Sequence, residues 1–330
     1  MTENSELQDT TVRSDQHRWK VYVVHSSLFL LTFFTATLAG VQWLNKDPLE
    51  LTNFSSGTTY SVLLLLVLAS HEFGHYFAAR YHKVNVTLPF FLPFPSFFGL
   101  FPFGTLGAVI RIRSSVPSRK VMFDIGAAGP LAGFVVSLAA LAIGLIFLPP
   151  REYLYNIHPE YAQLKAIPEA GLTFGNNLIY MILARLLVPP DAFVPPMNEL
   201  YHYPFLCVGW FGLFVTAMNL IPIGQLDGGH ISYAMFGQSY HKIAQTSIVL
   251  LLALGLAGFL PMLDIQFPYG WTGWLFWALV LIFFIRMSRF SRPVIEDESI
   301  LDPTRLIIGW VCFLIFIGSF SFNPFTIQLR

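Results

Sequence analysis

The sequence has little charge and little cysteine, and both shortages narrow the class of protein. Asp, Glu, Lys and Arg make up 12% of the 330 residues, whereas soluble domains carry about 25%. Basic and acidic side chains are equal in number, 19 of each, so no excess of positive charge favours nucleic acid. The two cysteines, Cys207 and Cys312, both lie in apolar runs, where buried thiols are expected. We therefore expect neither a nucleic-acid partner nor a soluble enzyme.

What the chain has in abundance is apolar sequence, with 55% hydrophobic residues and a mean hydropathy of +0.60. A helix that crosses a bilayer needs about 20 apolar residues. Residues 1–20 are polar without a cleavable signal pattern, so the first apolar run should remain as a span. The segments that qualify or nearly qualify are roughly 21–44, 58–81, 121–148, 205–223, 244–263, 270–286 and 304–322. This pattern predicts an all-α polytopic membrane protein with about seven transmembrane helices.

Basic residues gather on one side of these predicted spans, and in membrane proteins that side is cytoplasmic. They precede the first span, follow the second, precede the third and follow the sixth, for example Lys20, Arg80, Arg119 and Arg286. Seven spans place all of them on one face. The N-terminus should therefore be cytoplasmic, and the lipid bilayer is an implied partner. A prokaryotic inner (cell) membrane fits best, with an organelle membrane as the alternative.

Two connections between the spans are unusual. Residues 84–113 are apolar but rich in Pro and Gly, and such a loop exposed to lipid would leave backbone groups unpaired. We expect a re-entrant loop packed against protein, with its ends at 84–88 and 105–113 forming a small β-sheet. Residues 149–204 form a long outer loop, and its histidines, His158 and His202, show no partner pattern and receive no role.

A His-Glu-x-x-His motif lies inside the predicted second span. His71 and His75 are four residues apart, so they share one helix face and can bind one metal ion. Glu72, beside the first histidine, can take a proton from a metal-bound water. A charged residue within a span costs about 2.5–3.5 kcal/mol on insertion scales. The cluster therefore indicates a function, either a catalytic metal site or a proton relay in a transporter.

A candidate third ligand follows the fourth span. Asp227 lies among Pro222, Gly224 and Gly228, which should unwind the helix and let its carboxylate turn toward a neighbouring helix. A solvated acid at a helix end is the alternative interpretation. Both the histidine pair and Asp227 are expected in the cytoplasmic half of the membrane.

The chain resembles the site-2 protease family of intramembrane zinc metalloproteases. The resemblance rests on HEFGH, on NLIPIGQLDGG and on DIGAAGPLAGF, and covers about residues 58–236. It implies one Zn²⁺ per chain bound by His71, His75 and Asp227, with Glu72 as general base and Asn219 holding substrate or the oxyanion. The family's usual Pro-x-Pro-Pro-Leu-Asp-Gly reads Pro-Ile-Gly-Gln-Leu-Asp-Gly here, and Gly133 stands where the family often has Asn.

The predicted function is zinc-dependent hydrolysis of peptide bonds within or near transmembrane segments of other membrane proteins. A proton- or metal-ion-translocating transporter and a catalytically silent relative are the alternatives, and the oligomeric state stays open. The predicted organisation is a cytoplasmic tail at 1–20, a first span with its outer loop at 21–57, a catalytic core at 58–236 and C-terminal transmembrane helices at 237–330.

Overall fold

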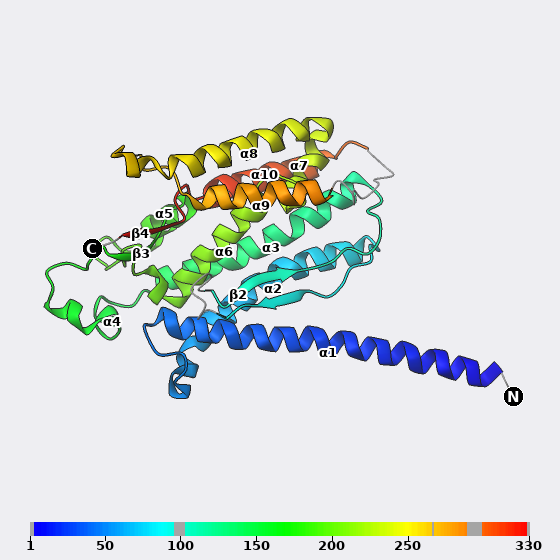
Figure 1. The fold of residues 1–330 in the computed structure, drawn as a ribbon, viewed down its shortest axis with the longest axis horizontal. Helices are drawn as coiled ribbons and strands as arrows, with labels where there is room; N and C mark the ends of the chain where they lie inside the picture. Colours follow the sequence, from blue (N-terminus) through cyan, green and yellow to red (C-terminus); the bar gives the residue numbers. More distant parts are fainter. Residues whose placement is uncertain (1–2, 96–102, 266, 289–298, 329–330) are drawn as a thin grey trace. The chain divides into compact units, whose positions relative to one another are not determined.

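The computed structural model describes residues 3–95, 103–265, 267–288 and 299–328 (Figure 1). The chain divides into two compact units. The first comprises Met1–Val62 and Thr87–Arg111, and the second comprises Leu63–Val86 and Ile112–Arg330. Each unit is described by itself.

The first unit combines a long helix with a β-hairpin. Helix α1 runs over Glu3–Trp43, a 3₁₀ turn covers Leu51–Gly57, and strand β1 (Phe90–Pro93) pairs antiparallel with β2 (Thr105–Val109). The buried Thr35 hydroxyl of α1 donates a hydrogen bond to the Gly104 carbonyl at 2.7 Å. This tie anchors the hairpin to the helix within the unit.

The predicted sheet exists, but its first strand was placed wrongly. The strand lies at Phe90–Pro93 and not at 84–88. Val84 is still engaged in ending helix α2 (Thr58–Tyr81), because its amide donates to the Ala79 carbonyl at 2.9 Å after a left-handed Lys83. Only a single bridge, Val86 to Ile112, remains of the predicted pairing there. Residues 96–102 of the predicted re-entrant loop lie outside the described residues.

The second unit is built almost wholly of helices, with one further two-stranded sheet of β3 and β4. Helix α3 packs extensively against α6, and α8 packs against α9 (Figure 1). Its elements after α2 are α3 (Arg119–Ile146), α4 (Glu152–Tyr155), η3 (Pro159–Gln163), β3 (Gly171–Phe174), α5 (Leu178–Leu187), η4 (Leu200–His202), α6 (Pro204–Leu220), α7 (Asp227–Phe236), η5 (Gly237–Ser239), α8 (Tyr240–Ala257), η6 (Leu260–Leu263), α9 (Gly273–Ser288), α10 (Pro303–Ser319) and β4 (Phe325–Gln328).

Small residues let α3 and α6 approach closely. A Cβ atom at Gly212 would lie 2.1 Å from the Ser137 hydroxyl, and one at Gly209 would lie 2.8 Å from the Leu141 backbone nitrogen. Without a solvent that drives apolar surfaces together, such close backbone packing is what holds membrane helices to one another. Helix α3 therefore forms the packing centre beside which α2 and α6 carry the residues of interest.

Four helical stretches among the described residues are long and apolar enough to cross a bilayer: Trp19–Trp43, Leu51–Tyr81, Arg119–Ile146 and Asp227–Ala257. Shorter apolar helices occur at Leu178–Leu187, Pro204–Leu220, Gly273–Phe283 and Pro303–Ser319. The mostly helical, membrane-spanning class is confirmed, while the count of seven spans stays a prediction. One predicted connection, 224–243, is largely helical instead, because the chain resumes a helix at Asp227 directly after the Pro/Gly turn.

Candidate metal centre

Helix α2 presents two histidines on one face at a buried position. His71 and His75 are each 6% exposed, and their Nε2 atoms lie 3.1 Å apart. Two ring nitrogens this close, on side chains one helical turn apart, are the arrangement that a shared metal ion requires. The i, i+4 spacing in the sequence predicted this pair, and the structure places it as predicted.

Asp227 reaches the same point from the first turn of α7. The chain breaks at the end of α6 and turns through Gly224, which has a left-handed φ of +59°. Gly228 and Gly229 then pass against the turn, where a Cβ atom would lie 2.0 Å from the Leu220 carbonyl and 2.4 Å from the Gly224 carbonyl respectively. Only glycine permits this close return of the backbone. The turn thereby aims the Asp227 carboxylate at helix α2.

The three side chains form a nearly regular triangle of donor atoms. Asp227 Oδ2 lies 3.3 Å from His71 Nε2 and 3.3 Å from His75 Nε2, which closes the triangle with the 3.1 Å separation of the two nitrogens. In a tetrahedral zinc site with bonds of about 2.0–2.1 Å, neighbouring ligands lie about 3.3 Å apart. The three donors therefore fit a tetrahedral zinc ion that keeps its fourth position open.

Helix α3 fixes the orientation of the His75 ring. Its Nδ1 lies 2.7 Å from the Ile125 carbonyl. A carbonyl can only accept, so Nδ1 carries the proton and Nε2 keeps its lone pair for a metal, which is the usual arrangement of a metal-ligating histidine. A Cβ atom at Gly129 would lie 2.1 Å from His75 Nε2, and one at Gly133 would lie 3.2 Å from His71 Cβ. These two glycines therefore let α3 approach the histidine side chains of α2 closely.

Two further predicted residues lie beside the triangle. Glu72 is 7% exposed and close enough to His75 to interact with it electrostatically. Asn219, at the end of α6, places its amide nitrogen 3.4 Å from His71 Nε2. The structure thus brings together a carboxylate, an amide donor and the three candidate ligands, all drawn from α2, α6 and α7.

The match to a family model decides the family. The model described as "Peptidase family M50" matches residues 59–260. The chain belongs to peptidase family M50. The resemblance to site-2 proteases is thereby confirmed.

Plant relatives support the same assignment. The chain is 31% identical over 259 residues to the probable zinc metalloprotease EGY1, chloroplastic, of Oryza sativa subsp. japonica, which covers 72% of the chain and 42% of the relative. It is 29% identical over 288 residues to the probable zinc metalloprotease EGY2, chloroplastic, of Arabidopsis thaliana, covering 86% of the chain and 46% of the relative. The chain therefore spans less than half the length of these relatives.

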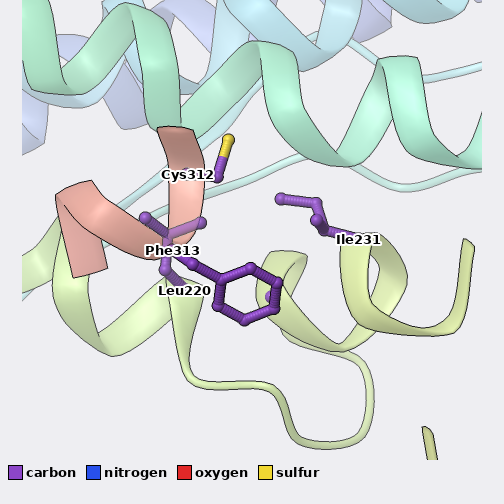
Figure 2. Close-up of a pocket in the computed structure, with 5 residues that line it drawn as sticks. Leu220, Ile231, Cys312 and Phe313 are labelled. Atoms are coloured by element: carbon purple, nitrogen blue, oxygen red, sulfur yellow. The ribbon is translucent and has the colours of Figure 1, made fainter. Parts of the chain in front are cut away.

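An apolar pocket lies behind the ligand-bearing turn of this M50 chain. Figure 2 shows Leu220, Ile231, Cys312 and Phe313 around it, and Gly228 completes its lining. The residues come from α6, α7 and α10, and the first turn of α7 is part of the wall. Because the lining offers no carboxylate or imidazole, we interpret the pocket as a gap in the packing of α6, α7 and α10.

One ion-pair network escaped the sequence analysis. Arg305 of α10 forms a two-pronged pair with Asp124 of α3, with nitrogen-to-oxygen distances of 2.8 and 2.6 Å. His82, at the end of α2, lies 2.8 Å from the same carboxylate, and Asp302 also pairs with Arg305. The partners are up to 181 residues apart in the sequence, so no local pattern could reveal them. The network ties α10 to the helices that carry and support the metal ligands.

Proposed function

We propose that this protein is an intramembrane zinc metalloprotease that hydrolyses peptide bonds of transmembrane proteins. The observation that carries the proposal is the triangle of donors from His71, His75 and Asp227, with edges of 3.1–3.3 Å, beside Glu72 in a helix apolar enough to cross a membrane. Family membership supports a zinc-dependent protease, and the relatives' names carry the same description. Residue roles and substrate class are our proposals.

The chemistry divides among the side chains as follows. A bound zinc ion would act as a Lewis acid and lower the pKa of a coordinated water toward about 7. Glu72 would accept the proton of the attacking water and pass it to the leaving amine. The Asn219 amide would donate a hydrogen bond to the oxyanion that develops on the scissile carbonyl. The His75 ring would be neutral, with its proton at Nδ1 bonded to the Ile125 carbonyl and the lone pair of Nε2 free for the metal.

The substrate should be a transmembrane helix, because the ligands lie in helices that are themselves apolar enough to cross a membrane. A helix hides its carbonyls in internal hydrogen bonds, so the substrate must unwind before attack. Strand β2 pairs with β1 along one side, and its other side could receive unwound substrate by strand addition. Proline placed at Leu106 or Ala108 should then slow cleavage, and unchanged cleavage would argue against strand pairing.

The decisive experiment is Glu72→Gln in the full chain. We expect cleavage of a model transmembrane substrate to fall below detection while zinc stays bound, since the glutamine cannot accept the proton. Glu169→Gln, an exposed acid of the outer loop, is the matched control and should cleave normally. Cleavage by Glu72→Gln at the wild-type rate would refute the mechanism.

Zinc content separates the alternative functions. A chain without tightly bound zinc that conducts protons in vesicles would be a transporter, and a zinc-loaded wild type without proteolysis of any membrane protein would be a silent relative. Proteomics of membranes with wild type and Glu72→Gln would identify substrates. The plant relatives carry the word chloroplastic in their names, whereas we predict a prokaryotic cell membrane. Fractionation of cells that express the protein would show which membrane contains it.

A further inference from the structure

A second group of two histidines and a carboxylate lies in the outer loop. His158, Glu199 and His202 each offer one donor atom, and these atoms lie within 4.8 Å of one another. His158 precedes the 3₁₀ turn η3, whereas Glu199 and His202 flank and end η4, directly before α6. The group therefore joins two points of the loop that are 44 residues apart.

The distances within this group resemble those of the membrane triangle, by which we mean the three donor atoms of His71, His75 and Asp227. The Nε2 atoms of His158 and His202 lie 3.0 Å apart, and Glu199 Oε2 lies 3.3 Å from His202 Nε2 and 4.0 Å from His158 Nε2. These edges bracket the spacing of about 3.3 Å between ligands of a tetrahedral zinc ion. Two histidines and one glutamate are also an established zinc ligand set.

The Glu199 carboxylate is buried and incompletely satisfied. Its side chain is 2% exposed. Oε1 accepts hydrogen bonds from the Tyr161 hydroxyl at 2.9 Å and the Asn198 amide at 3.2 Å. Oε2 faces the two histidines and receives no hydrogen bond from any described residue. A buried carboxylate oxygen left in this way requires a positive partner, because an uncompensated buried charge is strongly unfavourable.

The His158 ring is oriented as a ligand. Its Nδ1 lies 3.1 Å from the carboxylate of Glu160. Since an ionised carboxylate only accepts, Nδ1 donates, and the lone pair of Nε2 points at His202 and Glu199. A carboxylate that holds the far nitrogen of a histidine is the usual support of a metal-ligating ring. Glu199 thus faces the Nε2 atoms of the two histidines, whereas Glu160 holds the His158 ring at its other nitrogen.

We propose that His158, Glu199 and His202 bind a second zinc ion, which ties the outer loop to the beginning of α6. The ion would compensate the buried charge of the Glu199 carboxylate and would close the loop between η3 and η4. This site is separate from the catalytic one and does not depend on the proposed protease activity. It raises the expected zinc content from one ion per chain to two.

Zinc analysis of the purified full-length chain tests the proposal after dialysis against zinc-free buffer. We expect two zinc ions in the wild type, one in Glu199→Gln and one in His75→Asn, and none in the double variant. The glutamine preserves the shape of Glu199 and can keep its bonds to Tyr161 and Asn198. His241→Ala, which removes an exposed histidine of α8, is the control and should keep two ions.

Other outcomes overturn the proposal. One zinc ion in the wild type that His75→Asn removes, or two ions that Glu199→Gln retains, would show that the outer group holds no metal. One ion that Glu199→Gln removes and His75→Asn keeps would support the outer site while refuting the proposed catalytic one. If Glu199→Gln fails to fold, X-ray absorption of His75→Asn decides the matter, since the remaining zinc must show two imidazoles and oxygen, and any other ligand set contradicts the proposal.

Discussion

The membrane triangle and the outer-loop group use the same types of donor in different surroundings. In both, two imidazole nitrogens lie about as far apart as two zinc ligands, at 3.1 and 3.0 Å, with a carboxylate oxygen beside them. Next to the membrane triangle stand Glu72, buried, and Asn219, with its amide near His71. Around the outer group, the Glu160 carboxylate and the Tyr161 hydroxyl are bonded to the ligands themselves. Donor type therefore indicates a metal, whereas the neighbouring groups indicate what the metal does.

The way each group is supported also differs. The membrane histidines are fixed by backbone, through the Ile125 carbonyl and through glycines that allow α3 to touch the rings. The outer histidine His158 is fixed by an exposed carboxylate. Backbone support within packed helices is rigid, and catalysis needs ligands held in this way. The outer arrangement is better suited to tying a loop.

Gly129→Ala should separate the membrane triangle from the outer group with the largest effect. Because an alanine Cβ there would lie 2.1 Å from His75 Nε2, Gly129→Ala should expel the ring, remove the catalytic zinc and abolish cleavage, while the outer zinc stays. Zinc content and cleavage rate measure both effects. Gly133→Ala is the graded control, since its Cβ would meet His71 Cβ at 3.2 Å, and should lose less. Wild-type zinc content and cleavage in Gly129→Ala would contradict the described packing.

Asn219 tests whether the membrane triangle has an oxyanion donor. Asn219→Ala should lower kcat by about 10²–10³-fold, the usual cost of removing such a donor, with KM and the content of both zinc ions nearly unchanged. Steady-state kinetics on a model transmembrane substrate measures the split. A rise in KM at constant kcat would instead assign Asn219 to ground-state binding of substrate.

Chelation should distinguish the two sites by rate. The His158 side chain is 18% exposed, compared with 8% and 7% for His71 and His75. A water-soluble chelator should therefore remove zinc in two phases, the faster from the outer group, and cleavage should decline only with the slower phase. In Glu199→Gln the fast phase should be missing. Loss of cleavage in step with the fast phase would mean that the outer ion contributes to activity.

Of these changes, Tyr161→Phe should have the smallest effect, and it concerns the stability of the outer group. Tyr161→Phe removes one hydrogen bond to Glu199 and should lower the free energy of unfolding by about 0.5–1.5 kcal/mol. Burial, together with the bond to Glu199, raises the pKa of the Tyr161 hydroxyl. The difference between wild type and variant should therefore persist below about pH 10 and vanish only as the pH rises through the raised pKa. Thermal unfolding at several pH values measures it, and a difference lost near neutral pH would contradict the bond.

Much of the candidate catalytic site could be predicted because its signals are local. The spacing of His71 and His75 follows from the helical repeat, and their position in an apolar run indicates function. The Pro and Gly residues around Asp227 predicted that the regular helix ends there and that the carboxylate turns away from it. The predicted strand at 84–88 is wrong: the bond between the Val84 amide and the Ala79 carbonyl engages its first residue in the end of α2, and the rest pairs only as a single bridge.

By itself, the sequence determined the membrane class, the family and the histidine pair with its glutamate, since composition and short-range periodicity are properties of neighbouring residues. Only the tertiary structure decided that Asp227 Oδ2 stands 3.3 Å from both rings. It alone brought His158 beside His202 across 44 residues and Arg305 beside Asp124 across 181. Contacts of this kind depend on how helices and loops pack, and no local sequence pattern indicates them because the partners are far apart in the sequence.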